Sequence, residues 1–235
     1  MSNEEITFEG LISPLLYMPG EEHYAKATGR EATLESIVDF LCTHGLASDL
    51  PSLVSRYQEI SIEEQPLNVT PIEPWILEKL VWPLRHAKGS YILGNYLGTI
   101  ALCGIVAEMV AMLLFDISKP AISGKPMDKQ KQEELFGYTF ENLGQYRRVG
   151  VLQGLGLIDS DLKDSFEFVR ITRTKYLHHS SKDHTTLPGD AVAVFIKTVS
   201  LVVGVMGQDI KDGKLILGNK FIQHLRNLDA AKEGS

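Results

Sequence analysis

Apolar residues recur at intervals of three and four along much of this chain, the pattern of helices with one buried face. Glycine and proline residues interrupt the pattern repeatedly, and no stretch alternates convincingly in the manner of a strand. The sequence therefore predicts a nearly all-α protein whose main part is an antiparallel helical bundle. The predicted helices cover residues 33–44, 51–57, 75–86, 89–116, 129–138, 141–155, 160–178, 190–206 and 219–228.

A proline-containing stretch divides the chain. Pro66, Pro71 and Pro74 lie among acidic and polar residues between two helical regions, a composition typical of domain boundaries. We expect a small helical N-terminal extension over residues 1–74 and the helical bundle over residues 75–235. The extension is too short to form a core of its own, so we expect it to pack on the bundle.

The longest apolar segment runs from Tyr91 to Phe115 and is long enough to span a bilayer. Glu108 lies within it, and a carboxylate is costly in lipid. We therefore interpret the segment as the central helix of the bundle, buried on all sides, and expect no membrane contact.

Composition narrows the class of function. A net charge of −7 argues against a general nucleic-acid coat, so any contact with RNA must be local. The cysteines, Cys42 and Cys103, give no disulfide framework. The acidic N-terminus is not followed by an apolar run of signal-peptide length. These features predict a cytoplasmic protein, and the absence of a P-loop or a dinucleotide-binding loop gives no reason to expect a cofactor.

One predicted helix carries a charged residue on its apolar face. Phe166, Val169 and Tyr176 follow this face at steps of three and four, and Arg173 occupies a position where the pattern favours an apolar residue. A guanidinium there is either desolvated at a cost or faces a cleft, a partner or an anion. Arg173 is therefore the first candidate for a functional site.

His178 follows Arg173 by five residues. Along an ideal α-helix this interval is a rotation of about 140°, so the two side chains do not share a face. They converge only if the helix ends near His178, which the polar run from Ser180 to Thr186 supports, or if a second subunit supplies its own pair. This geometry predicts a homodimer with the helix near its interface.

The segment Arg173-Thr-Lys-Tyr-Leu-His178 matches the Arg-x4-His signature of the HEPN superfamily (higher eukaryotes and prokaryotes nucleotide-binding). Upstream, the run from Gly94 to Glu108 resembles the first core helix of that family, and the resemblance covers roughly residues 75–208. It is strongest to a bacterial branch of uncharacterised HEPN-like domains. The chain departs from the family at Thr174, where asparagine, aspartate or histidine is usual.

The resemblance implies a metal-independent endoribonuclease with a composite site across a dimer axis, acting as a toxin, with a cognate antitoxin partner, or as a phage-defence effector. The chemistry suits the residues. Histidine can exchange protons near neutral pH, and arginine can grip two phosphate oxygens. On this hypothesis His178 is the general acid–base and Arg173 the phosphate clamp, and Arg170, Lys175 and His179 bind the RNA backbone.

Two other interpretations remain open. Arg173 could pair with Glu108 or another buried acid and hold two helices together, with His178 capping the helix end. The protein would then be a non-catalytic helical module that binds a nucleotide or a partner protein. A metal site is the third interpretation, but its spacing matches no established motif, so no metal is predicted. Its ligands would be His178, His179, Asp183 and His184.

Overall fold

The computed structural model describes residues 50–61, 77–122, 124–178, 184–207, 209–211 and 214–233. The chain divides into two compact units, residues 1–53 and 54–235, and nearly all described residues belong to the second. The helix expected over residues 33–44 and the boundary expected at residue 74 lie outside the described residues.

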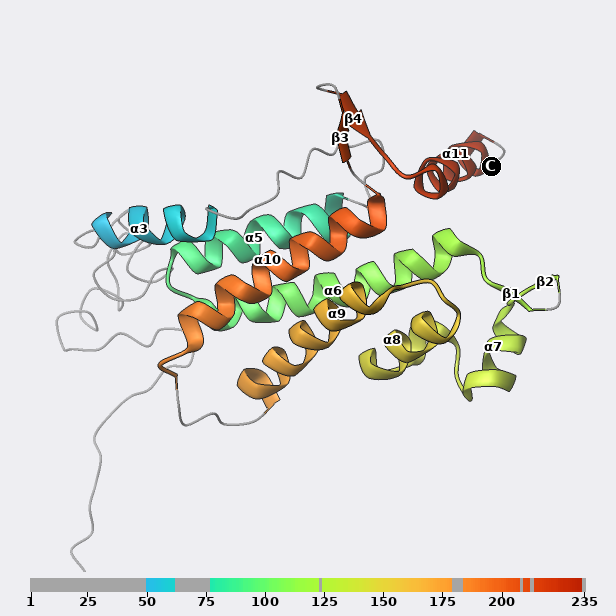
Figure 1. Cartoon of the computed structure of the whole chain (residues 1–235), viewed down its shortest axis with the longest axis horizontal. Coiled ribbons are helices and arrows are strands. Elements are labelled where there is room, and N and C mark those ends of the chain that lie inside the picture. The colour runs from blue at the N-terminus through green and yellow to red at the C-terminus, as the bar shows by residue number, and fades with distance from the viewer. Residues whose placement is uncertain are drawn as a thin grey trace, which may run out of the picture. The chain divides into compact units, whose positions relative to one another are not determined.

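The described part of the chain is mostly helical, as the sequence predicted (Figure 1). A 3-10 turn and two π-helical turns adjoin the helices: η2 (Leu77–Val81), η3 (Phe140–Asn142) and η4 (Thr174–His178). The α-helices are α3 (Leu50–Ser61), α5 (Trp82–Ile92), α6 (Tyr96–Ser118), α7 (Lys129–Phe136), α8 (Gln145–Gly154), α9 (Ser160–Arg173), α10 (Leu187–Met206) and α11 (Asn219–Glu233).

Two short antiparallel hairpins accompany the helices, and the sequence pattern did not reveal them. β1 (Ala121–Ile122) pairs with β2 (Lys125–Pro126), and β3 (Asp209–Lys211) pairs with β4 (Lys214–Ile216). Strands of two or three residues are too short for an alternation of apolar and polar positions to be visible.

The central helix begins later than the pattern indicated. The chain leaves α5 at Leu93, and Gly94 has a positive φ of 80°. Asn95 then caps α6 by accepting a hydrogen bond from the amide of Gly98 at 2.9 Å. A Cβ at residue 98 would lie 2.6 Å from Asn95 Nδ2, so glycine makes room for this cap.

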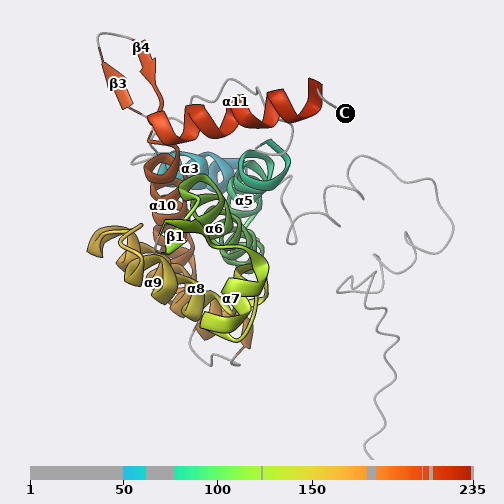
Figure 2. The ribbon, with the colours of Figure 1, turned by 90° about the vertical axis from the view of Figure 1, so that its right-hand side faces the viewer.

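Helix α6 forms the core of the second unit. Figure 2 shows it surrounded by α5, α10, α9 and α8, all of which contact it. Its buried residues include Ile100, Cys103 and Val110. Ile105 is 45% exposed, however, so the helix is central but not buried on every side.

Both α6 and α10 are long and apolar enough to cross a membrane by length and composition, although the sequence reading singled out only the first. In the most apolar 18-residue window, 56% of the residues of α6 and 44% of those of α10 are buried inside the protein. The two helices also pack against each other.

Helix α9 begins where the sequence predicted. Asp159 caps the helix by accepting a hydrogen bond from the Leu162 amide at 2.9 Å. The buried face includes Phe166, Val169 and Thr172. This packing presents the end of α9 to the middle of α6, where the candidate site lies.

Candidate functional site

Glu108, in the middle of α6, faces two arginines from two other helices. Its Oε1 accepts a short hydrogen bond from Arg173 Nη1 on α9, and its Oε2 lies 3.7 Å from Arg148 Nη1 on α8. Arg148 is buried and also donates to the carbonyls of Phe140 and Glu141 at 3.2 and 2.6 Å. One carboxylate therefore links α6, α8 and α9, and the Arg173–Glu108 pair considered from the sequence is present.

Arg173 reaches this carboxylate by crossing the α6 backbone at Gly104. A Cβ at residue 104 would lie 2.5 Å from Arg173 Cδ. Residues 104 and 108 are four apart, so they lie on the same face of the helix. Glycine at the first position therefore leaves the space through which the arginine contacts the glutamate at the second.

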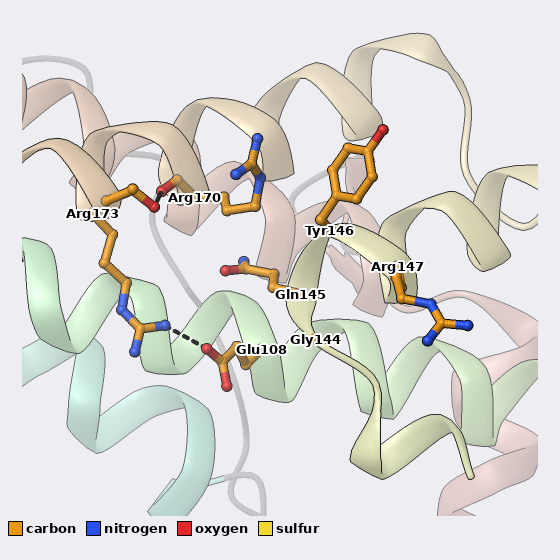
Figure 3. A pocket seen from close by; sticks show the side chains of 8 residues that line it. Glu108, Gly144, Gln145, Tyr146, Arg147, Arg170 and Arg173 are labelled. Carbon is orange, nitrogen blue, oxygen red and sulfur yellow. Dashed lines mark hydrogen bonds and ion pairs between the residues drawn. The ribbon is translucent and has the colours of Figure 1, made fainter. Parts of the chain in front are cut away.

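A cleft of about 340 Å³ opens beside the Arg173–Glu108 pair (Figure 3). Its walls come from α6, from the start of α8 and from the end of α9. Three arginines and one glutamate line it, in a protein of net charge −7. The lining residues are Glu108, Gly144, Gln145, Tyr146, Arg147, Arg170, Arg173 and Thr174.

Two nitrogen atoms of this lining are buried without a hydrogen-bond partner in the described part of the chain. They are Nε2 of Gln145 and Nε of Arg173. Leaving a buried donor unsatisfied costs about 1–3 kcal/mol. Figure 3 places the Gln145 amide between Arg170 and Glu108.

The first turn of α8 contributes further donors. No side chain caps this helix at Gly144, and its first helical hydrogen bond runs from the Arg148 amide to the Gly144 carbonyl. The preceding amides of the first turn have no helical acceptor, and the helix end carries a partial positive charge. These amides add to the positive potential that the arginine side chains create.

Arg170 lines the cleft, as its predicted role in RNA binding requires. Its Nε and Nη2 donate to Glu167 Oε2 at 3.0 and 2.6 Å. Its guanidinium carbon lies 5.3 Å from the centre of the Tyr146 ring, within the range of a cation–π contact. The guanidinium of Arg147 points away from the Arg173–Glu108 pair (Figure 3) and donates to the Phe136 carbonyl at 2.6 Å.

Lys175 does not line the cleft. Its Nζ donates to Asp190 Oδ2 at 2.9 Å and to Thr186 Oγ1 at 3.2 Å, so it connects η4 to the start of α10. Tyr176, which is buried, donates its hydroxyl to the same Asp190 oxygen at 2.6 Å. The ammonium predicted to bind RNA is therefore engaged in a polar cluster that holds two helices together.

The same hydrogen bonds set the charge state of Asp190. Partial burial raises its pKa, but the hydrogen bonds from Tyr176, Lys175 and Thr186, together with the charge of Lys175, outweigh burial. They leave the pKa of Asp190 below its usual value. The carboxylate thus stays ionised where it receives its three donors.

The π-helical turn η4 changes the expectation for residues 173 and 178. In a π-helix each amide bonds to the carbonyl five residues earlier, so the rotation between positions five apart is smaller than along an α-helix. The expectation that Arg173 and His178 point about 140° apart assumed an ideal α-helix, and the backbone of residues 174–178 is π-helical instead. The side chain of His178 and all of His179 lie outside the described residues, as do most ligands of the alternative metal site.

Thr174, which departs from the HEPN pattern, has a structural role within the helix. Its hydroxyl donates to the Arg170 carbonyl at 2.9 Å, a side-chain bond that competes with the regular backbone pattern. It also lines the cleft. The position is thus available to the site, but its hydroxyl is already used where α9 becomes η4.

We predict strong coupling between Glu108 and Arg173. Replacing either residue by alanine should lower the free energy of unfolding, because the remaining charge stays half-buried without its partner. The loss should be larger for Glu108→Ala, because Arg148 loses its partner too. The double variant should lose less than the sum of the single variants, with a coupling of about 0.5–3 kcal/mol in urea unfolding.

The exposed pair of Lys131 and Glu134, 2.7 Å apart on α7, provides the control for this cycle. Glu134→Ala should change the free energy of unfolding by no more than about 0.5 kcal/mol. Strictly additive effects of the Glu108 and Arg173 substitutions would show that the pair does not stabilise the fold.

We predict that Asp190 stabilises the protein in a pH-dependent way. Its folded-state pKa is depressed, so its contribution is present above the unfolded-state pKa of about 3.9 and is lost as pH falls through the lower folded-state value. Asp190→Asn should therefore lower the free energy of unfolding at neutral pH, and the difference from wild type should shrink below about pH 4. A difference that stays constant from neutral to acid pH would contradict this, and Asp164→Asn on the exposed face of α9 is the control.

No protein-family model, no curated protein and no solved structure matches this chain. Its function is therefore inferred from its own residues and their geometry.

Proposed function

We propose that the cleft between α6, α8 and α9 binds the phosphate groups of RNA or of a nucleotide. The observation that carries this proposal is that Arg170, Arg173 and Gln145 line one cleft of about 340 Å³, and that Nε2 of Gln145 has no acceptor among the described residues. Arginine is suited to phosphate because its planar guanidinium offers several donors in a fixed arrangement and is always charged.

Glu108 prepares the site rather than blocking it. It takes one donor of Arg173, Nη1, and leaves the buried Nε without a partner. The ion pair fixes the orientation of the guanidinium before a ligand arrives, which reduces the conformational entropy lost on binding. Arg170 pairs with Glu167, and Arg148 and Arg173 share Glu108, so these five side chains carry one positive charge in excess.

The HEPN resemblance is part of the same proposal. Its supports are the succession of helices from α6 to α10, and the position of Arg173 at the end of α9 and of His178 at the end of η4. By that resemblance we propose a cytoplasmic homodimer without membrane contact, whose partners include RNA or a nucleotide and, if it is a toxin, a cognate antitoxin protein. Glu108, which pairs with two arginines inside the unit, favours a core role for α6 over a place in lipid.

A second candidate function is metal-independent RNA cleavage by Arg173 and His178. The π-helical turn favours it, because the rotation between positions five apart is smaller in such a turn than along an α-helix. Arg173 would stabilise charge on the phosphorus, and His178 would transfer the proton. A second copy across a dimer axis would complete the set of two proton-transfer groups.

We predict that RNA binding depends on the arginines of the cleft. Arg173→Gln should weaken binding of a short single-stranded RNA and reduce the salt dependence of the affinity, with the slope of log K against log salt falling by about 0.7 for one lost phosphate contact. Arg173→Lys should keep the charge but lose the two-pronged contact, and bind with intermediate affinity. Fluorescence anisotropy over a series of salt concentrations measures both quantities.

Arg85, an exposed arginine on α5 that does not line the cleft, provides the matched control. Arg85→Gln removes the same charge and should leave the affinity and its salt slope nearly unchanged. Equal effects of Arg85→Gln and Arg173→Gln would show that the RNA responds to overall charge and not to the cleft.

Cleavage is predicted to need His178 and no metal. Wild-type protein incubated with single-stranded RNA and a chelator should leave a cyclic phosphate end, and His178→Ala should lower the rate by about 10²- to 10⁴-fold. His179→Ala should have a much smaller effect. Light scattering checks that the wild-type protein is a dimer. If that folded dimer leaves the RNA intact, the cleavage proposal is wrong and the binding proposal remains.

A further inference from the structure

We infer that the ring of Tyr146 is the stacking platform for an unpaired base, so that the ligand of the cleft is single-stranded RNA. This inference rests on the proposed phosphate-binding function and names its ligand more closely. It assigns to the site a residue that the sequence pattern did not single out.

Tyr146 is a conspicuous surface residue. Its exposed fraction is 67%, the largest among the exposed large apolar side chains of the described residues. A single exposed aromatic residue is common on protein surfaces, but this one belongs to the wall of a positively charged cleft. Tyr146 thus places an exposed aromatic ring at the edge of the cleft that we propose binds phosphate.

Arg170 packs against the ring of Tyr146. Its guanidinium carbon lies 5.3 Å from the ring centre, and Glu167 fixes the guanidinium through two hydrogen bonds to one oxygen. Planar guanidinium groups and aromatic rings are the two surfaces on which proteins stack unpaired RNA bases. Arg170 occupies one side of the Tyr146 ring, and the high exposure of the ring leaves room for a base.

The arrangement matches the layout of a nucleotide, which carries a phosphate and a base on one sugar. The phosphate donors include Gln145, and Tyr146 is the next residue on the same turn of α8. Figure 3 shows the Gln145 side chain directed toward the Arg173–Glu108 pair and the Tyr146 ring directed away from it. A phosphate in the cleft and a base on the ring would therefore occupy neighbouring but separate places.

Double-stranded RNA does not offer an unpaired base to Tyr146. In duplex RNA the bases are paired and stacked on one another, and the major groove is too deep and narrow for side chains to enter. Only an unpaired base can offer its face to a tyrosine. We therefore expect the cleft to prefer single-stranded over double-stranded RNA at equal phosphate content.

The test compares two probes that share charge but differ in bases: a short single-stranded oligoadenylate and inorganic polyphosphate of similar length. Tyr146→Leu should lower the ratio of the RNA affinity to the polyphosphate affinity by about five- to 150-fold, the range expected for one lost stacking contact. Tyr146→Phe, which keeps the ring, should restore most of the ratio. Duplex RNA should compete weakly with the oligoadenylate.

Tyr57→Leu is the matched control, because Tyr57 is 54% exposed and has the ammonium of Lys88 5.2 Å from its ring centre, yet does not line the cleft. It should leave the ratio at the wild-type value. Circular dichroism checks that each variant is folded. We expect the variants to fold, because both tyrosines are exposed.

The failures of the two proposals are distinguishable. If Arg173→Gln weakens binding of both probes but Tyr146→Leu leaves the ratio unchanged, the cleft binds phosphate and the stacking inference is wrong. The inference is also wrong if Tyr146→Phe lowers the ratio as much as Tyr146→Leu, since the hydroxyl would then be responsible. If neither probe binds the wild-type protein, the phosphate-binding function fails and the inference fails with it.

Discussion

The arrangement of this protein's site depends on one carboxylate placed in the middle of helix α6. Glu108 is separated from Arg173 by 65 residues and contacts it directly, and it is also within 3.7 Å of Arg148. The Glu108 side chain is 29% exposed, and ionic partners offset the cost of desolvating the rest of it. The two arginines are these partners, and in pairing with Glu108 they bring the start of α8 and the end of α9 to the same place.

A cross-link of this kind could exist for structural reasons alone, and the Arg173–Glu108 pair by itself does not indicate a ligand. The cleft beside it carries the functional argument. A purely structural ion pair would be expected to use its buried donors within the protein. Here the nitrogens Gln145 Nε2 and Arg173 Nε remain without acceptors in the described part of the chain, and both residues line the cleft.

The end of α9 shows how local and distant interactions share one segment. The Thr174 hydroxyl bonds to the Arg170 carbonyl, and the next two residues, Lys175 and Tyr176, are held by Asp190 at the start of α10. These contacts surround the π-helical turn on which the relation between residues 173 and 178 depends. The polar cluster at Asp190 therefore lies outside the cleft but adjoins the segment that shapes it.

The sequence by itself determined the features that depend on neighbours in the chain. Periodicity located the helices, because one-sided burial repeats every three to four residues. The same periodicity identified Arg173 as a charged residue on an apolar face. Glu108 argued against a membrane span, because a carboxylate is costly in lipid. Periodicity reports that a face is buried but not what covers it, so only the tertiary structure could bring Tyr146 beside Arg170 and engage Lys175 with Asp190. The π-helical turn was likewise hidden, because the α-helical spacing used to interpret the segment assumes the backbone geometry that this turn replaces.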